Sequence, residues 1–228
     1  MILFKPNKMF IGHFGIGLGA KGIDRRPSLG FFFFAAVWPD LLWPVLLLTG
    51  AEKVSIDPGN TRLSPLNFQY YPWSHSMLLD FLWGVLFGIV YYKISKNKRG
   101  SILIGVLVFS HWVLDLLVHG PDLQITPFSE TRVGLGLWNY EGIEITIETF
   151  LFLVGVLIYL RSTKPKNNIG IWLFWLFVAF LVGFFFMNVF GTPPSNVLLL
   201  EWIALGQWFL VAWGFWIDRN RISNNSDN

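Results

Sequence analysis

Six apolar stretches of membrane length constrain this chain more than any other feature. They occupy residues 29–49, 76–94, 101–118, 142–160, 169–190 and 196–217. A helix needs about 20 apolar residues to cross a hydrocarbon core about 30 Å thick, and backbone polar groups in lipid must be satisfied internally, which favours helices. Six such stretches in 228 residues leave too little polar chain to bury them in a soluble fold. We therefore expect an all-α fold, a polytopic transmembrane helix bundle with six full spans.

A further apolar piece, residues 9–20, is shorter. As a helix it is only about 18 Å long, and its glycines Gly15, Gly17 and Gly19 would allow close approach to a neighbouring helix. We expect a short, half-inserted N-terminal helix here. Residues 1–222 are expected to form a single transmembrane domain, followed by a polar, disordered cytoplasmic tail over residues 223–228.

Composition supports the membrane assignment. Residues of the apolar set make up 54% of the chain and charged residues 14%, whereas soluble domains carry about 25% charged residues. This excludes a disordered chain, a coiled coil, a collagen and a nucleic-acid binder. Cysteine is absent, so disulfides, thiolate metal sites and a cysteine nucleophile are excluded as well.

The basic residues predict the orientation in the membrane. They cluster before residue 29, in loops 93–100 and 161–168, and after residue 217, whereas the opposite loops 50–75, 119–141 and 191–195 hold only Lys53, Arg62 and Arg132. Cytoplasmic loops carry the excess of Lys and Arg. The sequence thus predicts a multi-pass protein of the plasma (inner) membrane, with a cytoplasmic C-terminus and two long loops facing outward.

Ionisable side chains inside the spans are functional candidates by default. They are Asp40, Asp80, His111, Asp115, Glu144, Glu148 and Glu201. Most lie toward the outer ends of the predicted helices, which indicates a polar cavity that opens to the outer face. For Asp80 and Glu201, near helix ends, contact with the lipid headgroups is the simpler interpretation.

The histidines predict a metal site. The chain has four, and three residues of one span, His111, Asp115 and His119, recur at i, i+4 and i+8. They share one helix face within an arc of about 80°, and the i, i+4 spacing suits metal ligation. The two histidines lie about 12 Å apart along the axis. Either two metals flank Asp115, or one of these histidines has another role.

The remaining ligands must come from other segments. The candidates are His13, Asp40 and His75, together with Glu144 or Glu148. A histidine such as His13 could instead be hydrogen-bonded to a neighbouring helix. We expect a divalent metal, zinc in the first place, with one or two ions.

These residues resemble the pattern of a family of membrane-bound metal-dependent hydrolases. That pattern has an N-terminal histidine, an aspartate in the next helix, a Thr/Ser-His-Ser and an H-x-x-x-D, and the matching residues here are His13, Asp40, Ser74-His75-Ser76 and His111/Asp115. The similarity to the family covers about residues 9–120. The family is distantly similar to zinc-dependent phospholipases C, which supply a late His-x-x-x-Glu pair. This chain has no histidine after His119, and Glu144 or Glu148 would have to replace it.

Two functions follow as hypotheses. The first is a metal-dependent hydrolase in the outer half of the membrane, with Asp115 and Glu144 as catalytic residues and a lipid phosphoester as substrate. Arg62, Arg132 and Asn139, on the outer loops, would bind the headgroup. The second is a transporter or permease that uses the intramembrane histidines and carboxylates as an ion or proton pathway. Membrane lipids are the expected partners in either case, and nucleic acid is not.

Overall fold

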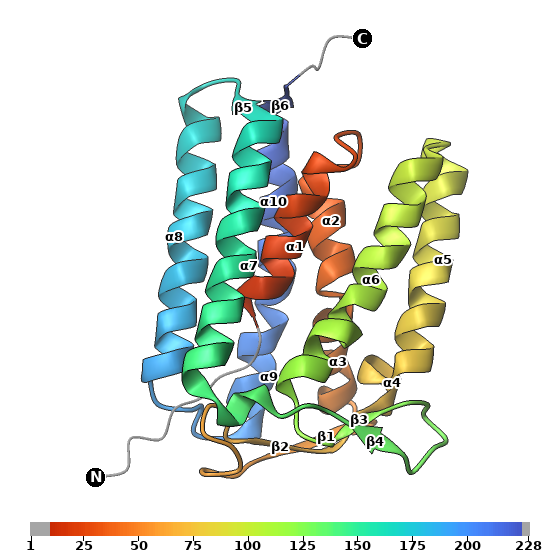
Figure 1. Cartoon of the computed structure of the whole chain (residues 1–228), viewed down its shortest axis with the longest axis vertical. Helices are drawn as coiled ribbons and strands as arrows, with labels where there is room; N and C mark the ends of the chain where they lie inside the picture. The colour runs from red at the N-terminus through yellow and green to blue at the C-terminus, as the bar shows by residue number, and fades with distance from the viewer. Residues whose placement is uncertain (1–9, 225–228) are drawn as a thin grey trace.

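The computed structural model describes residues 10–224 as a bundle of roughly parallel helices (Figure 1). The helices are α1 (Ile11–Gly19), α2 (Leu29–Ala36), α3 (Trp38–Leu48), α4 (Pro72–His75), α5 (Met77–Ser95), α6 (Lys98–Val118), α7 (Glu141–Ser162), α8 (Asn168–Phe190), α9 (Val197–Leu205) and α10 (Gln207–Arg219), with single 3-10 turns η1 (Ala20–Gly22) and η2 (Leu137–Asn139). The strands are β1 (Lys53–Ile56), β2 (Leu66–Tyr70), β3 (Leu123–Gln124), β4 (Arg132–Val133), β5 (Thr163–Pro165) and β6 (Arg221–Ser223).

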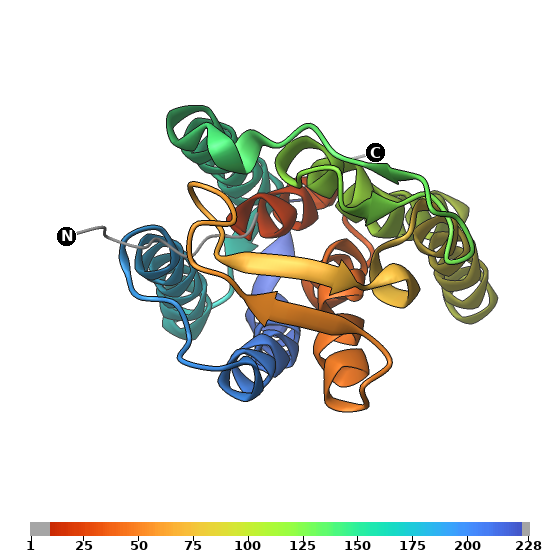
Figure 2. The ribbon, with the colours of Figure 1, turned by 90° about the horizontal axis from the view of Figure 1, so that it is seen from below.

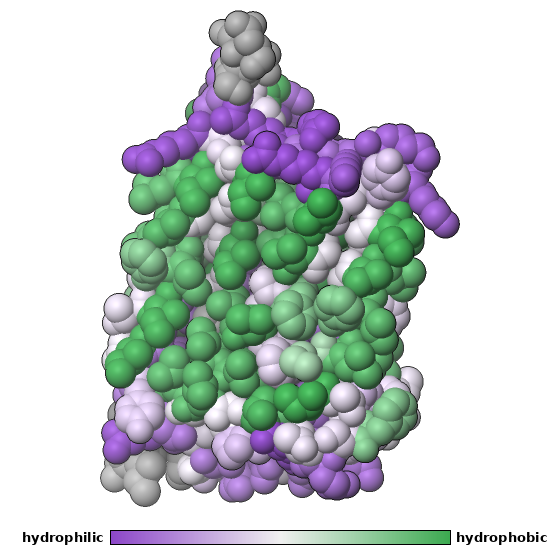
Figure 3. Space-filling model, turned by 45° about the vertical axis from the view of Figure 1, so that its right-hand side comes forward, coloured by the Kyte–Doolittle hydropathy of each residue, from purple (hydrophilic) through white to green (hydrophobic). Residues whose placement is uncertain are grey.

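Five spans are long and apolar enough to cross a membrane: α5, α6, α7, α8 and α9 with α10. The pair α2 and α3 makes a sixth if it is counted as one bent span. A broad hydrophobic band covers the face seen in Figure 3, between more hydrophilic ends. The expectation of a multi-pass helical membrane protein is thus confirmed.

One expected span is broken. Residues 29–49 form α2 and α3, which are bent by 57° at Val37, instead of one straight helix. Pro39 lies in the first turn of α3. Proline lacks a backbone N–H and disfavours helical geometry in the residue before it, so α2 cannot continue through this point. The break brings Asp40 into the first turn of a new helix.

The short helix α1 is buried inside the bundle, beside α7. A Cβ atom added to Gly15 would lie 2.6 Å from the carbonyl oxygen of Leu151, and one added to Gly155 would lie 2.0 Å from that of Gly15. Only glycine permits this backbone contact, as the sequence predicted for Gly15. Glu148 of α7 accepts hydrogen bonds from the N–H groups of Phe10 (2.7 Å) and Gly12 (3.0 Å). This carboxylate satisfies free donors at the N-terminus of α1 and holds the helix in place.

The two ends of the bundle differ. The basic segments 20–28, 93–100, 161–168 and 219–221 lie at the end that carries β5 and β6, here called the basic end. The other end, here called the hairpin end, carries the antiparallel pairs β1–β2 and β3–β4 (Figure 2). All three β pairs depart from the expected all-α fold: β1–β2 and β3–β4 each form within one long loop, and β5–β6 joins the α7–α8 connection to the segment after α10.

The tail expected over residues 223–228 begins later than the sequence suggested. Ser223 belongs to β6 and pairs with Thr163, and the backbone N–H of Asn224 donates to Ser162 (2.8 Å). The ordered chain therefore extends at least two residues into the segment expected as a tail. The remainder of that segment, residues 225–228, lies outside the described residues.

Candidate metal centre

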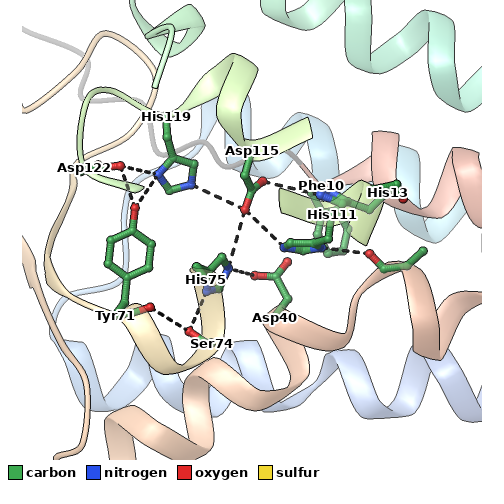
Figure 4. Close-up of polar contacts among 12 residues, drawn as sticks. Phe10, His13, Asp40, Tyr71, Ser74, His75, His111, Asp115, His119 and Asp122 are labelled. Atoms are coloured by element: carbon green, nitrogen blue, oxygen red, sulfur yellow. Dashed lines mark hydrogen bonds and ion pairs between the residues drawn. The ribbon is translucent and has the colours of Figure 1, made fainter. Parts of the chain in front are cut away.

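Four helices bring a cluster of histidines and aspartates together in the half of the bundle nearest the hairpin end (Figure 4). Its members come from α1, α3, α4, α6 and the residue that directly follows α6, and they are His13, Asp40, His75, His111, Asp115 and His119. All six are buried, with at most 6% of the surface of each residue exposed. The residues that the sequence predicted as metal ligands thus converge in space.

Asp115 lies at the centre of the cluster. Its Oδ1 is 3.5 Å from His13 Nε2, and its Oδ2 is 3.3 Å from His111 Nε2. His75 Nε2 lies 3.7 Å from Asp115 Oδ2 and equally far from Asp40 Oδ1, and His119 Nε2 lies 3.9 Å from Asp115 Oδ2. Every one of these histidines therefore directs its Nε2 atom toward the same carboxylate.

The tautomer of His111 follows from its outer partner. Its Nδ1 lies 2.9 Å from the carbonyl oxygen of Ala36, the last residue of α2 before the break. The last carbonyls of a helix lack intrahelical partners, and a carbonyl can only accept. Nδ1 must carry the proton, so in the neutral ring Nε2 holds a lone pair. That lone pair has no hydrogen-bond partner among the described residues.

His75 is oriented by a two-step chain. Glu52 accepts from the N–H (2.8 Å) and the hydroxyl (2.7 Å) of Ser74, whose Oγ lies 2.7 Å from His75 Nδ1. Burial raises the pKa of Glu52 to about 7. Above that pH the carboxylate only accepts, so Ser74 gives its proton to Glu52 and accepts one from Nδ1. Burial also lowers the pKa of His75, which favours a neutral ring with its lone pair on Nε2.

His119 has an equivalent support. Its Nδ1 is 3.0 Å from Asp122 Oδ1, and the Tyr71 hydroxyl donates to the same oxygen at 2.7 Å. Burial, together with the nearby Asp122 carboxylate, holds the pKa of Tyr71 well above its ordinary value. The phenol thus keeps its proton for Asp122. The His119 ring also packs on Trp138, with 4.1 Å between ring centroids, so its Nε2 is fixed toward Asp115.

This arrangement suits a cation. Lone pairs of neutral imidazoles that face a carboxylate repel it, and buried polar groups without partners are costly. Two sets of ligand atoms lie within 4.8 Å of one another, namely His13, His111 and Asp115, and Asp40, His75 and His111. Imidazole nitrogens and carboxylate oxygens are common ligands of zinc. Outer hydrogen bonds that fix the tautomer of each ligand are also typical of metal sites.

Within residues 10–224, His13 lacks the outer hydrogen-bond partner that the other three histidines have. Neither of its ring nitrogens has a hydrogen-bond partner among the described residues, although the side chain is only 1% exposed. Its ring lies against that of His111, with 4.0 Å between centroids. Its Nε2 lies 3.5 Å from Oδ1 of Asp115 on α6, so the simpler interpretation, a hydrogen bond to a neighbouring helix, stays a prediction. A cation would supply the missing partner.

The other predicted site residues lie elsewhere. Glu144 is buried on α7 and is hydrogen-bonded to Glu148, which supports α1 as described above. Arg62, Arg132 and Asn139 are exposed at the hairpin end, where Arg132 donates to the carbonyl oxygen of Gln69 (3.4 Å). The catalytic role of Glu144 and the substrate contacts of the other three stay predictions.

Several supporting residues were not singled out from the sequence. Glu52 and the carbonyl of Ala36 gave no signal, because their roles depend on how distant segments pack. Asp122 follows His119 by three residues, and that spacing could have indicated the pair. Asp80 was expected to reach the headgroups, but it is fully buried, and its two carboxylate oxygens have no hydrogen-bond partner among the described residues.

Comparison with known proteins gave no match: no protein-family model, no curated protein and no solved structure is significantly similar to this chain.

Proposed function

We propose that the protein is a membrane-embedded metal-dependent hydrolase that acts on a lipid phosphoester. The observation that carries the proposal is the direction of the histidines. In His75, His111 and His119 the Nδ1 atom contacts an outer partner, and Nε2 faces Asp115. Ion pairs or a structural hydrogen-bond network would need protons on those inner nitrogens. The resemblance to membrane-bound metal-dependent hydrolases, proposed from His13, Asp40, His75, His111 and Asp115, points the same way.

The chemistry follows from the ligand set. A divalent metal held there, zinc in the first place, would lower the pKa of a bound water to about 7 and polarise the scissile group. Imidazoles and carboxylates of the cluster would hold one or two ions. In hydrolysis the water oxygen bonds to phosphorus, the bond from phosphorus to the alcohol oxygen breaks, and the water proton ends on the alcohol. Asp115, whose oxygens face four histidines, would orient the water and accept its proton.

The orientation in the membrane belongs to the same proposal. Four basic segments share one end of the bundle, and the end rich in Lys and Arg is normally cytoplasmic. The C-terminus would then be cytoplasmic in the plasma membrane, and the metal centre would lie in the outer half of the bilayer. Arg62, Arg132 and Asn139 would meet the headgroup. A reporter fused after Asn228 that reports the outer compartment would contradict this orientation.

A transporter is the second candidate, favoured by the helix break beside the cluster. Discontinuous helices line the ion sites of many transporters, and here the broken pair α2 and α3 contributes Asp40 and the Ala36 carbonyl. Uptake of divalent metal ions by proteoliposomes, at a rate that depends on Asp40, would favour this function. Hydrolysis without ion movement would exclude it.

The primary test is metal analysis of the purified protein. The wild type should retain zinc or another divalent metal through purification, and the double variant His111→Ala/Asp115→Ala should not. Turnover of phospholipid substrates should stop with chelator and return with added metal. Asn97→Ala, at the basic end, is the control for handling and should retain the metal. A wild type that binds no divalent metal would overturn the proposal.

A further inference from the structure

A cavity of about 540 Å³ lies between α8 and the span formed by α9 and α10. Its walls are mostly apolar and include Phe180, Phe184, Met187, Leu199, Ile203 and Phe209. The volume is within the range of small-molecule sites, about 300–1,000 Å³. The His/Asp cluster uses none of these residues, so the cavity needs an explanation of its own.

The mouth of the cavity opens on an apolar surface that would face the hydrocarbon of a membrane. Met187, Leu199, Ile203 and Phe209 line it and are also exposed on the outer surface, between 42% and 61%. Both walls belong to spans long enough to cross a bilayer. Water in such an apolar space is unfavourable. The chains of membrane lipids are the apolar groups present at that mouth.

Polar side chains line one end of the cavity. Asn188, Thr192 and Ser195 line it where α8 passes into α9, at the hairpin end. Gln207, at the break between α9 and α10, is a further polar lining residue. Pro65 and Leu66 close the same end, on the loop that carries the exposed Arg62. An apolar space with a polar rim, three residues along the chain from Arg62, matches an amphiphile with an anionic headgroup.

The cavity is linked to the metal centre through α1 and α9. Phe10 lines it, and three residues later α1 presents His13 to Asp115. Leu200 and Ala204 line it from α9 and belong to the same buried cluster as Trp43 of α3, the helix that carries Asp40. Segments that line the cavity are thus continuous with, or packed against, segments that carry the His/Asp cluster.

We infer that this cavity binds an acyl chain of an anionic phospholipid, with its phosphate beside the β1–β2 loop. That this lipid is also the substrate of the metal centre rests on the proposed function. That the cavity binds the lipid rests on the cavity alone. The lipid would enter sideways from the membrane between α8 and α9, and its phosphoester would remain near the end where the His/Asp cluster lies.

The experiment uses the full-length protein in nanodiscs that contain phosphatidylglycerol with a photoactivatable diazirine in its acyl chain. Mass spectrometry of the labelled peptides should place the label on residues 180–210. Ile203→Trp, at the exposed mouth, and Ala204→Trp, inside the cavity, should each lower that labelling by about tenfold. Excluding two methylene groups at about 0.8 kcal/mol each has an effect of that size. Leu198→Trp, exposed on α9 but outside the lining, is the matched control and should label as the wild type.

The headgroup is tested with the same reagent. Arg62→Gln should reduce the preference for phosphatidylglycerol over a phosphatidylcholine probe and leave labelling by the latter unchanged. An equal preference in the wild type would overturn the assignment of an anionic headgroup.

Other occupants have distinct outcomes. A benzophenone amino acid placed at Phe184 should crosslink to lipid. Crosslinks to residues 1–9, or to a second copy of the chain, would identify those as the occupant and overturn the inference, as would labelling spread evenly over α5 and α8.

Metal content separates this inference from the proposed function. His111→Ala should lose metal and keep the lipid label, whereas Ala204→Trp should keep metal and lose the label. Metal retention in Ala204→Trp also shows that this variant folds. Labelling in a protein that binds no metal would leave the lipid site standing and refute the hydrolase.

Discussion

At the basic end of the bundle, Lys21 Nζ lies 3.0 Å from Asp218 Oδ1, and Asp24 accepts from Arg26 (2.9 Å) and Asn97 (2.8 Å). Each carboxylate there faces a proton donor. Near the hairpin end Asp115 is as well buried, yet it faces imidazole nitrogens, and in His75, His111 and His119 the other ring nitrogen contacts an outer partner. Buried aspartates thus face proton donors at the basic end and imidazole nitrogens near the hairpin end.

The difference separates structural from functional polar groups. A buried charge with its partner already in place holds helices together and requires nothing from outside. A carboxylate surrounded by lone pairs is incomplete until a cation arrives. Variants at the two ends should therefore separate cleanly. Changes at the basic end should alter stability, and changes in the His/Asp cluster should alter metal affinity.

The largest effect is expected for Asp115→Asn. The amide keeps the shape of the side chain but removes the charge that four histidines surround. The proposed metal affinity should fall by more than about 100-fold, because loss of an outer-sphere partner alone typically costs 10–100-fold. Calorimetric titration of the metal-free protein with Zn²⁺ measures it.

The matched control is Asp24→Asn, a buried aspartate at the basic end, which should bind Zn²⁺ as the wild type does. Equal affinity in Asp115→Asn and the wild type would show that the cluster is not a metal site.

The second prediction concerns the opposite end. Asp218→Asn leaves Lys21 buried without its counter-ion, and breaking a buried pair costs about 3–5 kcal/mol. Because Asp218 is 19% exposed on its side chain, the lower limit is expected. Unfolding in mixed micelles with increasing SDS measures the change in the free energy of unfolding. The metal affinity should stay the same.

Lys21→Met/Asp218→Leu, which removes both charges, should recover most of this stability. A double variant as unstable as the single one would show that packing, and not the unpaired charge, causes the loss.

The third prediction tests the support around the cluster. Ser74→Ala removes the acceptor of the His75 Nδ1–H, so the ring is free to change tautomer or turn. Metal affinity should fall by about 10–100-fold, as for other outer partners of metal ligands. Ser101→Ala removes a buried hydroxyl that donates to Asn97 at the basic end (2.6 Å) and should leave affinity unchanged. Equal losses in both variants would point to general destabilisation.

Much of this comparison was predictable from the sequence. Apolar length predicts the spans, and the i, i+4 pattern of His111, Asp115 and His119 predicts their common face, because both depend on helix geometry alone. The convergence of His13, Asp40 and His75 was expected from the need for ligands from other segments. The break at Val37 was missed, although Pro39 and Pro44 could have indicated it.

The supports of the histidines were beyond prediction. Glu52 contacts Ser74 across 22 residues, and Ala36 contacts His111 across 75. Glu148 shows the same limit: its spacing with Glu144 suggested a ligand, but its partners are backbone N–H groups of α1. Local periodicity places a side chain on a face, and only tertiary packing determines what that face meets.

The smallest effect concerns the pH dependence of the basic end. Burial alone would raise the pKa of Asp24. Hydrogen bonds from Arg26 and Asn97 outweigh this effect and lower the pKa from 3.8 to about 2. As pH falls, the unfolded chain therefore takes up the proton first, and the stability that Asp24 contributes declines as the pH falls through 3.8 and is lost below about 2. The shift corresponds to at most about 2 kcal/mol, and solvent around the exposed Arg26 guanidinium reduces it to about 1 kcal/mol. The difference in melting temperature between the wild type and Asp24→Asn should thus be constant above about pH 5 and shrink as the pH approaches 2. A difference that does not change over this interval would show that Asp24 acts through its shape and hydrogen bonds, and not through its charge.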